Sequence, residues 1–495
     1  MILDTPLSWR DVAAVAAGEP LELAASAAAR IAAARALVVS IVASDVRAYG
    51  VNTGVGALCE VVVDTAHQRQ LSRNILMSHA AGLGAPLGAI ETRAIMAAAI
   101  NNYAHGYSGV RPELVAALVA LREADCHPEV PSRGSLGYLT HMAHVGLALI
   151  GEGHVIRRGA RRPGAEVLRE LGLAPLVLEA KEGLSLVNGT PCATGLAAVA
   201  LVRMERLLGW ADAIAAMTAE TLHAQIRAYD AESLALRPSR GIELVGSRLR
   251  TALAGSAILA ASAGRRTQDP LCLRAVPQVH GAARDVFEAG AAVVDQELRS
   301  VTDNPLVAGT ASAPRVFSEA HAVGAALGLA ADGLGVAIAE LAAMSERRID
   351  RLVNPLVSRL PAFLAADSGV GSGLMIAQYT ALALVGENRR LAAPASLDGG
   401  VTSALQEDHV AHATPAAAKL LEILNNTQAI LAIELLAAAQ AYDLQPTALE
   451  RAPRTDAIYR MVRAHVAFYA DDRPLADDMS AVRGLLDAPA PELAP

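Results

Sequence analysis

Long segments rich in alanine and leucine constrain the fold of this 495-residue chain more than any other feature of its sequence. The clearest examples cover residues 190–225 and 321–346, and each has little polar face. Alanine and leucine are strong helix formers, whereas the aromatic residues that favour strands make up only 3% of the chain. We therefore expect an all-α protein built around a long central helix bundle.

The distribution of loops and apolar segments predicts three parts. Residues 1–190 are rich in glycine-containing loops and form a mixed N-terminal region, in which a helix is expected to begin at Pro112 with Glu113 in its first turn. Residues 191–485 are expected to form the central and C-terminal helical bundle. Residues 486–495 form an Ala-Pro tail that we expect to be loose.

Charge and cysteine spacing exclude several functional classes. The formal net charge of −8 argues against a nucleic-acid partner, which would require a basic face. The four cysteines are far apart without a C-x-x-C spacing, so neither a zinc site nor a disulfide framework is expected, and a reducing cytoplasm fits. The N-terminus lacks the basic and apolar regions of a secretory signal.

The mean hydropathy of +0.33 raises the question of membrane insertion. The apolar runs are interrupted by charges such as Arg203, Glu205 and Arg206. These runs fall short of the ~20 apolar residues that span a bilayer. We therefore expect no membrane segment and interpret the hydropathy as a large buried helical core shared between subunits.

The glycine-rich stretch AYGVNTGVG, residues 48–56, is predicted to be a loop that carries chemistry. It lacks the G-x-G-x-x-G spacing of a phosphate-binding loop, so a nucleotide site is not expected. Tyr49 stands at the start of this loop and is the candidate functional residue.

Eight motifs, in the same order and spread over roughly residues 10–470, resemble those of the histidine and aromatic amino acid ammonia-lyases. They include AYGVNTGVG at 48–56, SHAAGLGAPL at 78–87, AKEGLSLVNGT at 180–190, QDPLCLRAVPQV at 268–279 and QEDH at 406–409. The resemblance implies a carbon–nitrogen lyase that acts on a small molecule. It also implies a homotetramer of ammonia-lyase fold, whose active sites draw loops from three subunits.

Residue by residue, the resemblance implies that Tyr49 is the catalytic base and that Glu407 is catalytic and faces an imidazole ring. It places His79, Asn188, Gln268 and Arg274 around the substrate. Arg274 also suits a substrate carboxylate on chemical grounds, because the guanidinium fork matches two carboxylate oxygens. For Asn188 a structural role as a helix N-cap is the alternative.

Three positions depart from the family pattern. Ser135, Leu136, Gly137 and Tyr138 stand where relatives have Ala-Ser-Gly-Asp, in a loop that is three residues shorter. In the family this Ala-Ser-Gly triad cyclises into a methylidene-imidazolone electrophile, so we expect no electrophile and no other cofactor or metal here. Leu271 replaces a family tyrosine, and Glu319 and Ala320 replace an Asn-Phe pair.

Without the electrophile, a substrate that carries a good leaving group is expected. The chain resembles the ergothionase branch of the family, so the predicted reaction is elimination of trimethylamine from ergothioneine, with Tyr138 facing the quaternary ammonium. Hercynine, or another histidine derivative with an activated nitrogen, is an alternative substrate. A catalytically inactive scaffold that binds a histidine-like metabolite is an alternative from a different class.

Overall fold

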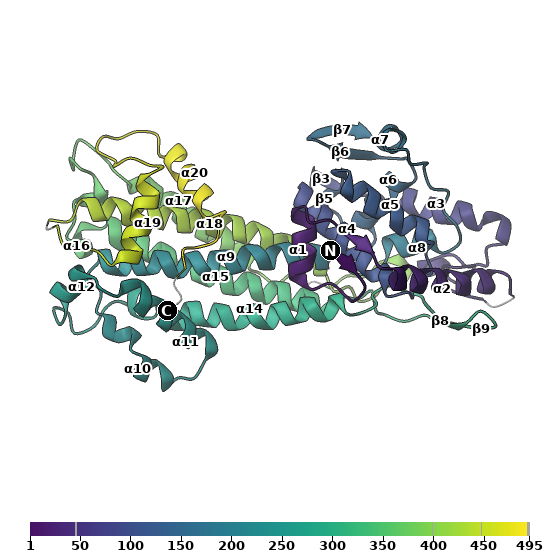
Figure 1. The fold of residues 1–495 in the computed structure, drawn as a ribbon, viewed down its shortest axis with the longest axis horizontal. Coiled ribbons are helices and arrows are strands. Elements are labelled where there is room, and N and C mark those ends of the chain that lie inside the picture. The colour runs from purple at the N-terminus through teal and green to yellow at the C-terminus, as the bar shows by residue number, and fades with distance from the viewer. Residues whose placement is uncertain (45–46, 398, 447, 493–495) are drawn as a thin grey trace. The chain divides into compact units, whose positions relative to one another are not determined.

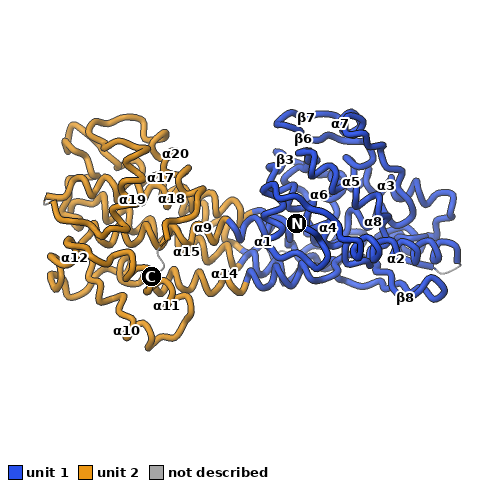
Figure 2. The backbone as a smooth tube through the Cα atoms, viewed as in Figure 1, with its two compact units in different colours: residues 1–202, 290–332, 394–418 blue, residues 203–289, 333–393, 419–495 orange. Residues whose placement is uncertain are grey.

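The computed structural model describes residues 1–44, 47–397, 399–446 and 448–492, so the last three residues of the predicted tail lie outside the described part. It is mostly helical, as predicted, with a few short strands (Figure 1). The chain forms two compact units, each assembled from three segments (Figure 2). Unit 1 comprises residues 1–202, 290–332 and 394–418, and unit 2 comprises residues 203–289, 333–393 and 419–495. The linear division at residue 190 stays a prediction.

Four long helices contribute residues to both units, and they include the two segments from which the fold class was predicted. The longest expected helix, 190–225, is observed from Pro191 to Thr221. The four are α9 (Pro191–Thr221), α14 (Val276–Leu298), α15 (Ala325–Val353) and α18 (Ala413–Asp443).

Unit 1 contains the shorter N-terminal helices and the strands. Helix α5 begins at Pro112, as predicted, because proline at the first helical position has no N–H to leave unpaired. The helices are α1 (Trp9–Ala17), α2 (Ala25–Val42), α3 (Gln68–His79), α4 (Ala89–Ala104), α5 (Pro112–Glu123), α6 (Thr140–Leu149), α7 (Gly164–Glu170) and α8 (Glu182–Val187).

The strands of unit 1 are short and form small, separate sheets. β1 (Ile2–Leu3) and β2 (Glu22–Leu23) pair in parallel, whereas the other sheets are antiparallel. β3 (Leu83–Pro86) pairs with β5 (Pro131–Arg133). A three-stranded sheet has the order β4 (Cys126–Pro128), β6 (His154–Arg157) and β7 (Ala160–Pro163), and a hairpin joins β8 (Leu306–Thr310) to β9 (Ala313–Phe317).

Unit 2 is helical throughout its described elements. Ser239 caps α11 by accepting a hydrogen bond from the backbone N–H of Ile242. The shorter helices of this unit are α10 (Ala231–Ala235), α11 (Arg240–Leu253), α12 (Ala257–Ser262), α13 (Leu271–Arg274), α16 (Pro355–Ser358), α17 (Met375–Leu391), α19 (Pro453–Arg463) and α20 (Leu475–Leu485).

The prediction that the apolar runs are too short to span a bilayer is wrong by length and composition, because four helical segments are long and apolar enough: 25–42, 182–221, 325–353 and 413–443. Of the residues in the apolar stretch of 182–221, 94% are buried inside the protein. In the apolar stretch of 413–443 the share is 78%. Burial of this extent accounts for the hydropathy of these two segments by packing within the protein.

A small apolar cluster fixes the loop that carries Tyr49. Ala48 and Val51, on either side of the tyrosine, are buried against α2 and β8. Burying such side chains stabilises the loop by about 25 cal/mol per Å² of apolar surface. The Tyr49 loop is thus held from its apolar flanks, while the tyrosine itself faces a cavity.

Candidate active site

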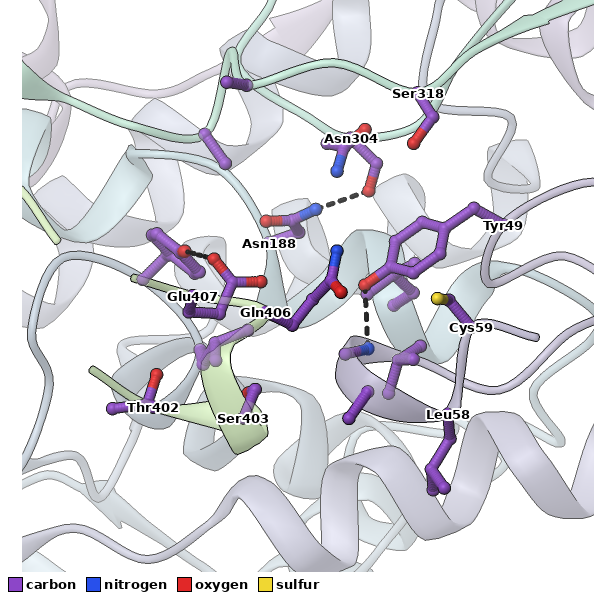
Figure 3. A pocket seen from close by; sticks show the side chains of 18 of the residues that line it. Tyr49, Leu58, Cys59, Asn188, Asn304, Ser318, Thr402, Ser403, Gln406 and Glu407 are labelled. Atoms are coloured by element: carbon purple, nitrogen blue, oxygen red, sulfur yellow. Dashed lines mark hydrogen bonds between the residues drawn. The ribbon is translucent and has the colours of Figure 1, made fainter. Parts of the chain in front are cut away.

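A cavity of about 1040 Å³ lies within unit 1, and side chains from separate segments of the chain line it. These segments are the Tyr49 loop, the end of α3, the loop before α6, the end of α8, the residues around 304 and 318–323, and residues 402–410. Figure 3 shows Tyr49, Asn188, Gln406 and Glu407 pointing toward this shared space. The cavity brings together five residues singled out from the sequence: Tyr49, His79, Tyr138, Asn188 and Glu407.

Tyr49 is held by its own loop. Its phenolic oxygen accepts a hydrogen bond from the backbone N–H of Gly56 at 3.0 Å, drawn as a dashed line in Figure 3. Burial raises the pKa of Tyr49 above its ordinary value, and the charge of Glu407 acts in the same direction, while the Gly56 N–H opposes both. At neutral pH Tyr49 is therefore a phenol, and it becomes a base by losing a proton at alkaline pH.

Glu407 lies on the opposite wall, next to a short backbone bridge. Its carbonyl oxygen accepts a hydrogen bond from the N–H of Thr402 at 2.8 Å. Its carboxylate oxygen Oε2 accepts a hydrogen bond from the hydroxyl of Tyr138 at 3.0 Å. Burial and the Glu407 charge raise the pKa of Tyr138, so Tyr138 stays protonated and acts as a donor.

Asn188 ends helix α8 rather than capping the start of α9, which begins at Pro191. Its side-chain oxygen accepts a hydrogen bond from the Gly189 N–H at 3.0 Å, and its amide nitrogen donates to the carbonyl of Asn304 (Figure 3). The N-cap alternative is therefore not what the structure shows. Both amide atoms are engaged at the wall of the cavity, which fixes the orientation of the group.

His79 is the last residue of α3 and also lines the cavity. Its Nδ1 lies 3.0 Å from the hydroxyl oxygen of Ser78. Burial lowers the pKa of His79, so the imidazole is neutral at pH 7 and can present either a donor or an acceptor.

Gln268 and Arg274 lie in unit 2 and do not line the cavity of unit 1. They are neighbours of each other: with the Gln268 amide oriented so that its oxygen faces the guanidinium, that oxygen accepts a hydrogen bond from Arg274 Nη1 at 2.8 Å. Leu271, the residue in place of the family tyrosine, is exposed at the start of α13. The structure therefore places Arg274, the predicted carboxylate-binding residue, and Gln268 outside the set assembled around Tyr49.

Sequence reasoning did not single out Asn304 and Gln406, which also line the cavity. Asn304 stands before a proline, and the signal that it belongs to the site is its contact with Asn188, more than a hundred residues earlier in the chain. Glu319 was noted only as a departure from the family pattern, and it too lines the cavity. Its Oε1 is buried and has no hydrogen-bond partner among the described residues.

A buried ion pair supports the wall that carries Asn188 and Asn304. Lys181 Nζ lies 3.1 Å from Asp303 Oδ2, and both side chains are fully buried. The same Nζ donates to the hydroxyl of Ser185 at 2.7 Å. This pair connects the start of α8 to the segment of Asn304, two parts of the chain that are separated by more than a hundred residues.

The loop before α6 does not fit the methylidene-imidazolone implied by the family resemblance. The chain contains no Ala-Ser-Gly triad from which the ring could close. The backbone of this loop is engaged in ordinary hydrogen bonds: the Gly137 carbonyl accepts from Thr414 Oγ1 at 3.0 Å, and the Leu139 N–H donates to the Val187 carbonyl at 2.8 Å. The groups that this cavity offers for chemistry are therefore its side chains. Within the described residues, no group of three or more His, Cys, Asp or Glu side chains could hold a metal ion.

Comparisons with known proteins agree over nearly the whole chain. A model of the family "Aromatic amino acid lyase" matches residues 7–464. The histidine ammonia-lyase of Deinococcus radiodurans is 44% identical, with 98% of this chain and 93% of the relative aligned, and that of Stigmatella aurantiaca is 43% identical, with 94% and 92% aligned.

Solved structures give the same fold. The crystal structure of histidine ammonia-lyase from Trypanosoma cruzi matches with a TM-score of 0.90 at 36% identity, covering 98% of this chain and 93% of that one. The ergothionase of Treponema denticola, solved with desmethyl-ergothioneine sulfonic acid, matches with a TM-score of 0.92 at 27% identity, covering 98% of both chains.

These comparisons overturn the prediction that the chain eliminates trimethylamine from ergothioneine. Relatives that are 40–44% identical over nearly the whole chain are named histidine ammonia-lyase, whereas the ergothionase is a more distant neighbour in sequence. The prediction inferred the leaving group from one shortened loop, and the similarity of the remaining chain outweighs that loop. The role of Tyr138 as a partner of a quaternary ammonium is lost with that substrate, and in the structure its hydroxyl binds Glu407.

Proposed function

Because this chain belongs to the aromatic amino acid lyase family, we propose that it is a carbon–nitrogen lyase that eliminates ammonia from L-histidine. The products are ammonia and the acrylate conjugated to an imidazole ring. The observation that carries the proposal is that Tyr49 and Glu407 line one cavity, which pairs a candidate base with a carboxylate suited to an imidazole N–H. The names of the relatives support histidine as the substrate.

The proposed elimination balances without an added proton donor. Tyr49, in its deprotonated form, takes a proton from Cβ of the substrate, and the electron pair of that bond forms the Cα–Cβ double bond. The Cα–N bond breaks, and its electron pair leaves with nitrogen. An α-ammonium group departs in this way as neutral ammonia.

Glu407 supplies the activation in this proposal. A carboxylate paired with the imidazole ring favours its protonated form. An imidazolium ring withdraws electron density from the adjacent Cβ and so makes the Cβ proton more acidic. His79 and Asn188 offer neutral hydrogen-bonding groups to the rest of the substrate.

The substrate carboxylate is assigned to Arg274, with Gln268 beside it. Since neither residue lines the cavity of unit 1, we propose that another copy of the chain supplies them in a homotetramer, as the family resemblance implies. A guanidinium brought to the cavity would bind the carboxylate through two parallel hydrogen bonds.

The proposal is tested by incubating the purified full-length chain with L-histidine. Ammonia release and the ultraviolet absorption of the conjugated product are followed together. L-phenylalanine and L-tyrosine serve as comparison substrates, because they lack a ring nitrogen that could pair with Glu407. We expect ammonia from histidine in preference to both. Absence of ammonia release from histidine at millimolar concentration would reject the proposed reaction.

A further inference from the structure

The loop between β5 and α6, residues 134–139, is held by hydrogen bonds to its backbone. The Gly137 carbonyl accepts a hydrogen bond from Thr414 at the start of α18, and the Leu139 N–H donates to the carbonyl of Val187 at the end of α8. Both partners belong to the same unit as the loop. The position of the residue between these two anchors, Tyr138, is therefore fixed from both sides.

Leu139, whose N–H makes one of these hydrogen bonds, has a backbone conformation that is unfavourable for a leucine. Leu139 has φ 78° and ψ −78°, a region that residues with a large side chain rarely adopt. Such conformations cost on the order of 1–3 kcal/mol and persist only where the surroundings determine them, commonly at functional sites. In this loop the strained residue directly follows Tyr138, and its N–H is held by the Val187 carbonyl, so the backbone next to Tyr138 is restricted to one conformation.

The hydroxyl of Tyr138 binds one oxygen of Glu407 and leaves the other available. The 3.0 Å hydrogen bond goes to Oε2, and no other described side chain makes a hydrogen bond to this carboxylate. Both residues line the cavity, and both are partly buried. A hydrogen bond to a charged group in such a site is stronger than one between neutral groups, so it can determine how the carboxylate is turned.

We propose that Tyr138 is a positioning residue, which turns the Glu407 carboxylate so that its second oxygen faces the imidazole ring of the substrate. In this proposal the shortened loop orients Glu407 and does not form an electrophile. This inference rests on the proposed function for the identity of the ring. The effect of the hydrogen bond that orients Glu407 for a ligand can be measured by ligand binding, without turnover.

The test uses 3-(imidazol-4-yl)propionate, which carries the ring and the carboxylate but has no amine to lose. Binding is measured by calorimetry with the full-length chain. Tyr138→Phe keeps the ring and removes the hydroxyl, and we expect the dissociation constant to rise about tenfold, the effect of one charge-assisted hydrogen bond of ~1.4 kcal/mol. Tyr107→Phe, at an exposed tyrosine of the same unit, is the matched control and should bind as wild type does.

A second pair of variants separates positioning from a merely structural role. In a Glu407→Ala background Tyr138 has no carboxylate to orient, so Tyr138→Phe should change the dissociation constant by less than about twofold. With L-histidine as substrate, Tyr138→Phe alone should raise KM more than it lowers kcat. Tyr138→Trp cannot place a hydroxyl at the same point, so it should not restore binding of the probe.

The outcomes distinguish the two proposals. If wild type binds the propionate probe and Tyr138→Phe weakens it only when Glu407 is present, the positioning role stands even where histidine yields no ammonia. If Tyr138→Phe binds as wild type does, if its effect persists in the Glu407→Ala background, or if wild type does not bind the probe, the positioning role is overturned.

Discussion

The backbone N–H of Gly56 donates a hydrogen bond to the phenolic oxygen of Tyr49 at 3.0 Å, while the charge of Glu407 acts on the same phenol in the opposite sense. The N–H stabilises the phenolate, and the carboxylate destabilises it. Burial adds to the effect of the carboxylate and is the larger cause, so the net result is a raised pKa. The raised pKa of Tyr49 therefore makes its phenolate a stronger base and also makes that phenolate scarce at neutral pH.

Tyr49→Phe should lower kcat for ammonia release from histidine by about 10²- to 10⁴-fold, the range typical of a lost general base. The aromatic ring remains, so the dissociation constant of the unreactive propionate probe should change little. Steady-state kinetics and calorimetry measure the two quantities. A variant that retains more than a tenth of the wild-type kcat would remove Tyr49 from the role of base.

The activity should rise with pH. A base acts in its deprotonated form, and because the pKa of Tyr49 is raised above its ordinary value, the deprotonated fraction grows by up to about tenfold per pH unit through the neutral and mildly alkaline range. In Glu407→Gln the charge is absent, so the alkaline limb of the kcat/KM profile should move to lower pH. If the alkaline limb of the Glu407→Gln profile stays at the same pH or moves to higher pH, the coupling between Tyr49 and Glu407 is contradicted.

Lys181→Met should destabilise the protein by about 3–5 kcal/mol, because it leaves the fully buried carboxylate of Asp303 without a counter-charge. The shift in the denaturant midpoint at fixed protein concentration measures this effect. The double variant Lys181→Met with Asp303→Asn removes both charges and should recover part of the loss. Equal destabilisation by the single and double variants would mean that packing, not charge, governs this site.

Gly50→Ala should disturb the Tyr49 loop. Gly50 has φ +60°, and a Cβ there would lie 2.1 Å from Leu184 Cδ2, a side chain that lines the cavity. We expect a loss of stability of about 1–3 kcal/mol together with a higher KM. Gly172→Ala is the matched control, because it has φ +71° with open space around its Cβ and so reports the backbone term alone. Similar melting temperatures and KM values for both variants would show that the contact with Leu184 is unimportant.

Helix positions were predictable because their signals are local. Pro112 marks the start of α5, and the Ala- and Leu-rich run after residue 190 corresponds to α9 within a few residues. Tyr49, His79, Asn188 and Glu407 were identified by motif and Tyr138 by a departure from one, and the structure shows that all five share one cavity. Their chemical roles stay predictions.

The contacts made across long sequence separations were not predictable. Asn304 belongs to the cavity through its carbonyl contact with Asn188, and the hydrogen bond between Tyr138 and Glu407 spans more than 260 residues. Neither pair has a sequence signature. The leaving group was predicted wrongly for a related reason: the substrate is set by the whole lining of the cavity, and a single loop is a small part of it.

The residues that line the cavity are far apart in the sequence, so the ribosome synthesises them at different times. Tyr49 and Glu407 face the same space, yet about 360 residues separate them. At ~5–20 residues per second, the ribosome adds Glu407 roughly 20–70 s after Tyr49. Throughout that interval the nascent chain carries the tyrosine without the acid, so we expect a chain truncated before residue 400 to lack the proposed activity even where its early helices fold.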